Sequence, residues 1–366
     1  MLKNKKICFI SPKAYQLFNP KVKSTFGGAE VQLSLLAKEF AKDKKLDVHF
    51  MVADYGQRNK EIYNNIKIWK SLNFKDNKLK QIIKFFGIFN KINADIYIQR
   101  ALSPFSGIIA LYCKIKKKKF VYMVAHDSES DETHEIYKGK IKSFLANLTF
   151  KYANKIIVQN EYQKKNLLNN FNRESFLLKK GLIINSIKKD KKRYDAIWVG
   201  RCEKWKNPDI FLNLVKSFPN NNFLMICSKA TNKEEYFKEI LKKASKLKNL
   251  RFIKFIENNK INNLLYQSKV FIFTSDQEGD WPMTILEAAS CGVPIISYKL
   301  NYNYLIDKYE GGIYCNNDFN ELKKTFEDLT LKNKKIKKYS KNVYEYAKEN
   351  HDIKVNAKKF KEIILK

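Results

Sequence analysis

The 366-residue chain is predicted to fold as an α/β protein with two domains. Short apolar runs alternate with longer helical patterns, and several of these runs are apolar on both faces. Strands of this kind belong to parallel sheets that are covered by helices. The alternation starts again after a polar break, IINSIKKDKKRYD at residues 183–195, which we interpret as the interdomain linker. We therefore expect one domain at 1–184 and a second at 185–343.

Five strands are expected in each domain, in chain order. In the first domain they are KICFIS (6–11), VHFMVAD (48–54), DIYIQR (95–100), KFVYMVAHD (119–127) and KIIVQN (155–160). In the second domain they are AIWVG (196–200), FLMIC (223–227), RFIKFI (251–256), KVFIFTS (269–275) and VPIISY (293–298). The pattern at residues 339–366 predicts one or two closing helices.

The net charge of +34 predicts an anionic partner, which could be a nucleic acid, a membrane surface or a phosphorylated substrate. A solvated lysine surface explains much of the excess, but residues 56–125 hold 15 Lys and Arg against 3 Asp and Glu. No run of about 18 apolar residues occurs, and the first apolar run is too short for a signal peptide. A cytoplasmic protein is expected. The six scattered cysteines have no metal-ligand spacing and are expected to be reduced, buried thiols.

Two glycines, Gly27 and Gly28, precede an amphipathic helix that is expected to start near Ala29. Glycine lets backbone amides approach a ligand closely, and the N-terminus of a helix favours anions. A plain loop before a helix explains these residues at least as well. Glu30, in the first turn, is most simply a favourable charge at the positive end of the helix dipole.

A histidine, His126, ends an apolar strand, which is where ligand crevices open in α/β sheets. A structural role and a ligand-facing role fit this residue equally well. The acidic residues that follow it, within 127–135, are irregularly spaced for a metal site and are interpreted as a solvated loop.

Two cations follow the first strand of the second domain. Arg201 comes directly after Gly200, and Lys206 stands just before Pro208, which opens the next predicted helix. Arginine offers a planar fork and lysine a point charge, so the pair could bind a diphosphate. Among 71 basic residues, two surface cations prove little, and it is their position after a strand that favours a site.

The segment SDQEGDWPMTILEAASCGVP, residues 275–294, follows an expected strand and contains two glutamates. Pro282 suits a first helical turn, and the helix MTILEAASCG is expected to end near Gly292. Glu278 then lies in the loop and Glu287 about two turns into the helix.

These positions suggest chemistry for the same segment. Glu278 could accept hydrogen bonds from sugar hydroxyls, and Glu287 could accept two from a ribose diol. The free amides near Met283 and Thr284 could bind phosphate. A capping residue and an amphipathic-helix glutamate explain the pattern without any ligand.

Taken in this order, the four segments resemble the retaining glycosyltransferases of family 4, which have the GT-B fold. The matching segments are FGGAE (26–30), His126 at a strand end, GRCEKWK (200–206) and EGDWPMTILEAASCGVP (278–294). The resemblance covers nearly the whole chain and is more specific in the second half. It implies two Rossmann-like domains that face a cleft, with the last helix, about 344–366, returning to the first domain.

The resemblance implies transfer of a sugar from a nucleotide-diphosphate sugar to a glycan or lipid-linked acceptor, with retention and without a metal or other cofactor. Cell-surface polysaccharide biosynthesis, such as that of lipopolysaccharide or capsule, would use such an enzyme. Arg201 and Lys206 would bind the diphosphate, and Glu287 would bind the ribose. Glu278, with nearby amides, would bind the sugar.

The same resemblance assigns roles in the first domain, where the Gly27-Gly28 loop and His126 would complete the site. His126 and Glu278 are the residues expected to serve the transfer step, and no protein nucleophile is evident. The chain departs from the family at one point, because eight residues, not the usual seven, separate Glu278 from Glu287. The simplest account is one added residue, Asp280, which could then contact the sugar in place of Glu278.

Residues 78–92, KLKQIIKFFGIFNKI, are a candidate amphipathic helix. Lys80, Lys84 and Lys91 fall within about 40° of one another around such a helix. The apolar residues expected on its far side are Leu79, Ile82, Ile83, Phe85, Phe86 and Phe89. The helix could pack on its own domain or lie in an anionic membrane surface. With the lysine-rich run at 114–119, it favours peripheral binding to the inner face of the cell membrane.

Two other functions compete with the transferase. The charge alone suggests a nucleic-acid-binding protein, although no helix-turn-helix, zinc-finger or RNP motif is evident. Another enzyme of the same fold, such as a nucleotide-sugar epimerase, would use a similar donor site. A nucleic-acid-binding protein would not bind a nucleotide sugar, whereas the transferase would. An epimerase would produce epimerised donor, or release the sugar, in the absence of an acceptor.

Overall fold

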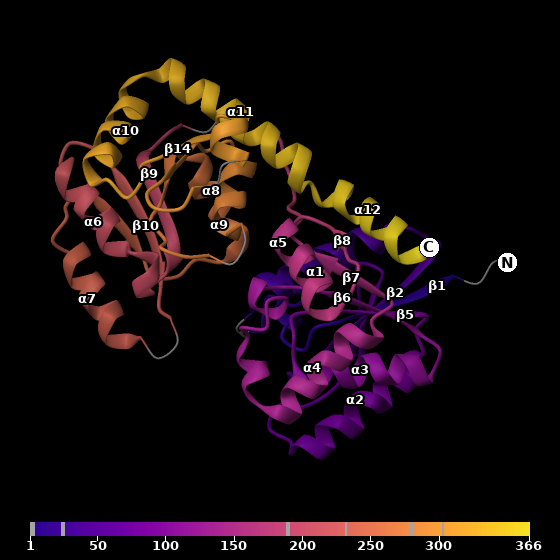
Figure 1. Cartoon of the computed structure of the whole chain (residues 1–366). Coiled ribbons are helices and arrows are strands. Elements are labelled where there is room, and N and C mark those ends of the chain that lie inside the picture. The colour runs from indigo at the N-terminus through magenta and orange to yellow at the C-terminus, as the bar shows by residue number, and fades with distance from the viewer. Residues whose placement is uncertain (1–3, 23–25, 188–190, 231–232, 279–280, 302–303) are drawn as a thin grey trace. The chain divides into compact units, whose positions relative to one another are not determined.

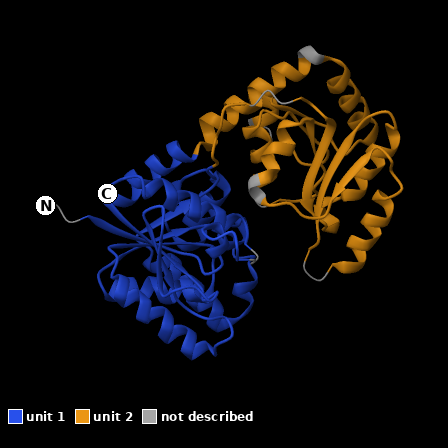
Figure 2. Ribbon diagram, turned by 180° about the vertical axis from the view of Figure 1, so that it is seen from behind, with its two compact units in different colours: residues 1–181, 353–366 blue, residues 182–352 orange. Residues whose placement is uncertain are grey.

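The computed structural model describes the chain apart from residues 1–3, 23–25, 188–190, 231–232, 279–280 and 302–303. The chain forms two compact units, shown in Figure 2: unit 1 contains residues 1–181 and 353–366, and unit 2 contains residues 182–352. Each unit is a mostly parallel sheet with helices on both faces (Figure 1). The predicted α/β class is therefore confirmed.

Unit 1 has an eight-stranded sheet in the order β3-β4-β2-β1-β5-β6-β7-β8. Its strands are parallel except for the β3–β4 pair. The strands are β1 (Lys5–Ile10), β2 (Leu46–Val52), β3 (Lys60–Tyr63), β4 (Ile66–Lys70), β5 (Ile96–Arg100), β6 (Lys119–Met123), β7 (Lys155–Val158) and β8 (Phe176–Leu177). The helices are α1 (Gly28–Phe40), α2 (Lys78–Ile92), α3 (Pro104–Ile115), α4 (Lys140–Tyr152), α5 (Glu161–Phe171) and α12 (Ile353–Leu365).

Unit 2 has a six-stranded, wholly parallel sheet in the order β11-β10-β9-β12-β13-β14. The strands are β9 (Tyr194–Arg201), β10 (Phe223–Ser228), β11 (Leu250–Ile253), β12 (Ser268–Phe273), β13 (Ile295–Ser297) and β14 (Gly312–Tyr314). The helices are α6 (Pro208–Ser217), α7 (Glu234–Ala244), α8 (Asn258–Tyr266), α9 (Met283–Ser290), α10 (Phe319–Leu331) and α11 (Asn333–His351).

Alternate residues of the strands enter separate cores on the two faces of each sheet, as the two-residue period of a strand requires. In unit 1, Ile7 and Phe9 of β1 pack with α1 and α12, whereas Cys8 and Ile10 pack with the helices of the other face, α2 to α5. All of these strand residues are buried, which explains why the strand sequences are apolar on both faces.

All ten expected strands are present, and four short ones were not anticipated: β3, β4, β8 and β14. The β3–β4 hairpin turns at Asn64 and Asn65, which have φ angles of 46° and 64°. Asparagine tolerates this left-handed conformation and is common in tight hairpins. The Asn-Asn pair between IY and IKIW was therefore the signal that the sequence interpretation missed.

The closing segment consists of two helices, α11 and α12, and the chain returns to unit 1 at Ile353. Phe360 of α12 packs against Phe40 of α1 with ring centroids 5.7 Å apart, and Lys361 forms an ion pair with Asp43 at 2.6 Å. Burial of Phe360 beside α1 therefore anchors the returning segment in the core of unit 1.

Helices α3 and α4 pack closely because α3 carries a glycine at their contact. A Cβ atom added at Gly107 would lie 1.8 Å from the backbone oxygen of Leu145. We therefore expect Gly107→Ala to lower the free energy of unfolding by about 2 kcal/mol, because backbone and not a movable side chain blocks the space. Chemical denaturation measures the change. Gly87→Ala is the matched control, since nothing lies within 4 Å of that position in α2 and alanine is the better helix former. Equal stabilities of the two variants would contradict this packing.

Candidate functional site

The candidate residues of unit 2 gather at the carboxyl edge of its sheet. Strand β9 ends at Arg201, and its neighbour β12 ends at Phe273. Strand β10 lies on one side of β9 and β12 on the other, so the strand order reverses at this point. Ligands of open parallel sheets bind where this reversal occurs, outside the carboxyl ends of the strands.

Hydrogen bonds join the loops that follow these two strands. The Thr274 hydroxyl donates to the Lys206 carbonyl at 2.6 Å and accepts from the Trp198 indole at 2.9 Å. Asn207 donates to the Asp276 carboxylate at 2.6 Å. These contacts fix the turn that carries Lys206 against the loop that carries Glu278.

Lys206 and Glu278 form an ion pair within this framework, and their side chains are only 13% and 14% exposed. The Lys206 ammonium also lies 4.3 Å from the centroid of the Trp205 ring. Burial lowers the pKa of Lys206, and the nearby Glu278 carboxylate opposes that shift. Glu278 therefore favours the charged form of the lysine. From the sequence, each of the two residues was expected to bind a different part of the ligand, and the ion pair between them was not expected.

Arg201 is exposed at the end of β9, and no hydrogen bond or ion pair of its side chain is found within the described part of the chain. Its positive charge contributes to lowering the pKa of Lys206, so the two cations are electrostatic neighbours. Two cations held near each other without a shared anion form a suitable site for a diphosphate.

Helix α9 begins beside this loop at Met283, after Pro282. Its first helical hydrogen bonds run from the amides of Ile285 and Leu286 to the Pro282 carbonyl, so the two preceding amides lie ahead of the ladder. The Thr284 hydroxyl is buried and makes no hydrogen bond with the described residues. An unpaired hydroxyl at the positive end of a helix is suited to bind an anionic oxygen.

Glu287 lies one turn further along α9 and is half-buried. Burial raises the pKa of this carboxyl to about 7. Among the described side chains, none donates a hydrogen bond to it. A carboxylate that is desolvated and still lacks donors can accept hydrogen bonds from a ligand diol. Asp280, the residue that explains the longer spacing, lies outside the described residues together with Gly279.

The candidate residues of unit 1 lie at the start of α1 and in the loop after β6. Helix α1 begins at Gly28, and the Gly27 amide donates to the Glu30 carboxylate at 2.8 Å. Glu30 thus caps the helix through a specific hydrogen bond in addition to its charge. Gly27 and Gly28 are exposed.

His126 follows β6 and is exposed. Partial removal from water lowers its pKa, and the cations of Lys180 and Arg100 add to this effect. We therefore expect a neutral imidazole at pH 7. The backbone before it is held by Gln159, whose amide donates to the carbonyls of Val124 and Ala125 at 3.0 Å each.

The acidic residues after His126 have separate protein partners. Asp127 accepts from Asn160 and Gln163, buried Glu129 accepts from the Tyr122 hydroxyl at 2.6 Å, and Asp131 accepts from Thr133. These carboxylates therefore support the loop around His126.

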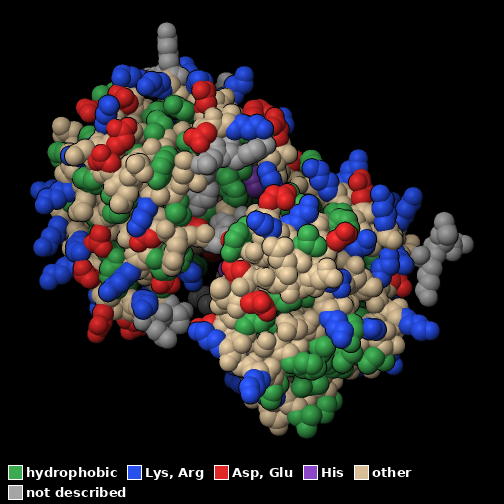
Figure 3. Space-filling model, viewed as in Figure 1, with side chains coloured by type: hydrophobic (Ala, Val, Ile, Leu, Met, Phe, Trp, Pro, Cys, Tyr) green, Lys and Arg blue, Asp and Glu red, His purple; other side chains and the backbone are tan. Residues whose placement is uncertain are grey.

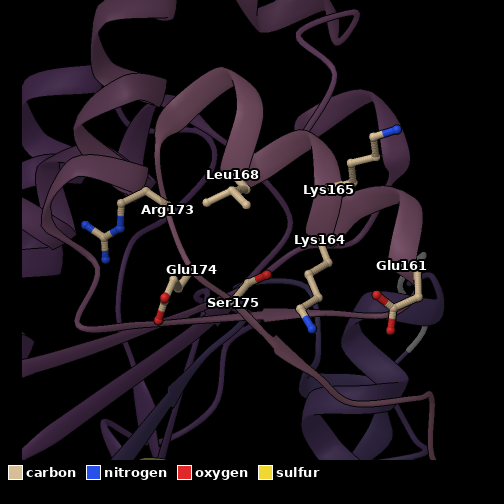
Figure 4. A pocket seen from close by; sticks show the side chains of 7 residues that line it. All are labelled: Glu161, Lys164, Lys165, Leu168, Arg173, Glu174 and Ser175. Carbon is tan, nitrogen blue, oxygen red and sulfur yellow. The ribbon is translucent and has the colours of Figure 1, made fainter.

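A hollow of about 520 Å³ lies elsewhere on unit 1, beside α5 (Figure 4). It is lined by Glu161, Lys164, Lys165, Leu168, Arg173, Glu174 and Ser175. The Arg173 guanidinium donates to the carbonyls of Lys151 and Ala153 at the end of α4, and its side chain points away from Lys164 in Figure 4. Arg173 therefore has a structural role in this hollow, which contains none of the candidate site residues.

Residues 179–349 match the family model of the glycosyl transferases group 1. Apart from residues 179–181, the matched segment lies within unit 2. An uncharacterized glycosyltransferase of Methanocaldococcus jannaschii is 25% identical over 370 residues, which cover 92% of this chain and 94% of that protein. These findings support a glycosyltransferase.

Two solved structures have the same fold along nearly the whole chain. Sucrose-phosphate synthase of Thermosynechococcus elongatus gives a TM-score of 0.75 at 14% identity, over 98% of both chains. HepE of Anabaena, in complex with UDP and glucose, gives a TM-score of 0.74 at 16% identity, over 98% of this chain and 99% of that one. The expected GT-B fold is confirmed by these two structures.

Proposed function

We propose that the protein transfers a sugar from a nucleotide-diphosphate sugar to a hydroxyl acceptor, with retention of the anomeric configuration. The observation that carries this proposal is the pair of cations, Arg201 and Lys206, near the amino end of α9 at the point of strand reversal. The UDP and glucose complex of the similar Anabaena structure suggests UDP-sugars as the first donors to test.

The cations would act on the leaving group. Breaking the bond between sugar and phosphate leaves an additional negative charge on the diphosphate, and preorganised cations stabilise that charge more in the transition state than in the ground state. Glu278 favours the charged form of Lys206 until the donor arrives. The proposed mechanism uses this clamp for charge stabilisation and requires no metal or further cofactor.

The two glutamates would recognise the donor. Glu287 would accept hydrogen bonds from the ribose diol, because its carboxylate lacks protein donors among the described residues. Glu278 would contact the sugar with its second oxygen, and Asp280 remains a candidate for the same contact. The amides of Met283 and Thr284 would bind a phosphate oxygen.

His126 is proposed to serve the transfer step, with the Gly27-Gly28 loop also contributing from unit 1. We expect His126→Ala to lower turnover about tenfold or more, because a neutral imidazole at a strand end can exchange hydrogen bonds with reacting hydroxyls. Donor affinity should change little, because the clamp lies in unit 2. Steady-state kinetics with donor and acceptor varied separately measure the effects on turnover and on donor affinity. Unchanged turnover would remove His126 from the mechanism.

The acceptor is proposed to be a glycan or a lipid-linked saccharide of a cell-surface polysaccharide such as lipopolysaccharide or capsule. We propose that the enzyme works on the cytoplasmic side, in contact with an anionic membrane surface through residues 78–92 and 114–119. In the described chain, no helix has the length and apolar character needed to span a bilayer.

A thermal-shift panel of UDP-, GDP- and ADP-sugars tests the proposed function. One nucleotide class should raise the melting temperature of the wild type by several degrees, because a ligand that binds only the folded state stabilises it. A short oligonucleotide serves as the comparison anion. Stabilisation by the oligonucleotide alone would support a nucleic-acid-binding protein and refute the transferase.

A further inference from the structure

Helix α3 is apolar on the side that faces away from the sheet. Its buried residues, among them Ile109 and Cys113, pack on the sheet. The opposite side carries Ile108, Leu111 and Ile115, which follow the spacing of a helical stripe. Ile115 is 68% exposed. A soluble helix normally places polar residues on its outer side, so this stripe requires an explanation.

The neighbouring helices continue this apolar surface. Helix α4 packs directly on α3 at Gly107 and exposes Ile141 and Phe144 by 78% and 63%. Helix α2 packs on α3 through Phe89 and Tyr112, whose rings are 5.3 Å apart, and exposes Leu79 and Ile83. Figure 3 shows hydrophobic side chains gathered over these helices at the bottom of the view.

The six apolar residues of α2 were expected on one side of the helix. This prediction was wrong, because they point in two directions. Phe85 and Phe89 enter the core, whereas Leu79 and Ile83 remain at the surface. The 3.6-residue period of the helix separates the two sets, and the charges of Lys80 and Lys84 are partly balanced by Asp76 at 3.3 and 2.7 Å. Electrostatic attraction must therefore come mainly from the other lysines.

The three segments that form and follow α2, α3 and α4 are rich in lysine and contain no acidic residue. Residues 78–92, 104–119 and 140–152 contain four, five and three lysines, and neither Asp nor Glu. A hollow of about 450 Å³ lies at the ends of α3 and α4. It is lined by Lys114, Lys117, Lys118, Lys119, Lys151, Tyr152, Ala153 and Asn154.

We infer that the outer surface of α2, α3 and α4 docks on an anionic lipid bilayer. The apolar side chains would enter the interfacial region, and the lysines would contact lipid phosphates, including those that reach the lysine-lined hollow. A second copy of this chain would bring the same cations face to face, which charge repulsion disfavours. This inference extends the proposed membrane association and rests on that part of the proposed function alone.

Vesicle flotation of the full chain tests the docking surface. Vesicles of equal parts phosphatidylcholine and phosphatidylglycerol should carry the wild type upward at low salt, and phosphatidylcholine vesicles should carry much less. We expect Phe144→Ser and Ile115→Ser each to weaken the partition about tenfold, because each removes an exposed apolar side chain that would insert into the lipid interface. Ile62→Ser is the matched control, because Ile62 is 70% exposed on β3 of the same unit.

A second set of variants tests the charges. Lys116→Glu with Lys142→Glu should weaken partition at least about tenfold, whereas Lys246→Glu with Lys248→Glu in unit 2 should leave it unchanged. Equal losses in both double variants would show that only net charge matters and would overturn the surface. A dimer that Phe144→Ser dissociates would assign the face to a second copy, which also overturns the proposal.

The thermal-shift panel separates this inference from the enzyme chemistry. Wild type that is stabilised by a nucleotide sugar but does not float with anionic vesicles would refute the docking surface and leave the transferase intact. Flotation without any nucleotide-sugar stabilisation would support the docking surface and refute the proposed donor site.

Discussion

Replacing Lys206 with alanine is expected to lower sugar transfer about 100-fold or more, because it removes a preorganised cation from the leaving diphosphate. Part of the loss should appear as weaker donor binding, because the substitution also removes a cation from the ground-state complex. The remainder should appear in turnover, since the charge on the leaving group is larger in the transition state. Initial rates over a range of donor concentrations separate the two effects.

The same substitution leaves Glu278, which is 14% exposed, without its ionic partner, so Lys206→Ala alone is expected to destabilise the protein. Combining it with Glu278→Gln removes the unpaired charge and should restore part of the stability without restoring transfer. Lys204→Ala is the matched control, because Lys204 lies in the same turn and is exposed. A Lys204→Ala variant as inactive as Lys206→Ala would contradict a specific clamp.

Glu287→Gln is expected to weaken donor binding roughly 30-fold, because hydrogen bonds from a ribose diol to a carboxylate are stronger than those to an amide. Since burial raises the pKa of Glu287 to about 7, donor affinity of the wild type should fall as the pH drops below 7 and the carboxylate becomes protonated. The variant should lack this pH dependence. Calorimetric titration at pH 6 and pH 8 measures both effects.

The stability of the free protein should change in the opposite sense. The folded state holds the Glu287 proton more tightly than the unfolded state does. The contribution of this group to the free energy of unfolding therefore falls as the pH rises from about 4.5 to 7. At pH 8 Glu287→Gln is expected to be more stable than the wild type by about 2 kcal/mol, after allowance for partial exposure of the side chain. Glu235→Gln in α7 is the control, because that glutamate is exposed. Equal stability of wild type and Glu287→Gln at every pH would contradict the desolvated carboxyl.

The long, buried strands could be predicted from the sequence because their apolar residues form continuous runs. The helices between them could be predicted because their apolar residues recur with the helical period. Strands such as β1 and β10, whose apolar residues are all buried, could be located to within a residue or two. The β3–β4 hairpin was missed because only Ile66 and Ile68 are fully buried there, so its pattern is polar and short. Its turn depended on two asparagines and not on the glycine that usually marks such turns.

The sequence was sufficient to predict which residues belong to the candidate site, but not which of them contact one another. The positions of Arg201 after β9 and of Glu287 on α9 followed from strand and helix signals in the sequence. The Lys206–Glu278 pair could not be predicted, because it depends on hydrogen bonds of Thr274 and Asn207 that join two loops about 70 residues apart in the chain. The exposed stripe on α3 was missed for another reason: a helix that is apolar all round gives no periodic signal of which side faces solvent.

The most direct test of the account compares the affinity of the protein for a nucleoside diphosphate and for the corresponding monophosphate by calorimetric titration. The nucleotide is the one whose sugar stabilises the wild type. We predict that the wild type binds the diphosphate at least about tenfold more tightly, because Arg201 and Lys206 would contact the second phosphate. Lys206→Ala should lose most of this preference. Equal affinities of the wild type for the two nucleotides would contradict the proposed clamp.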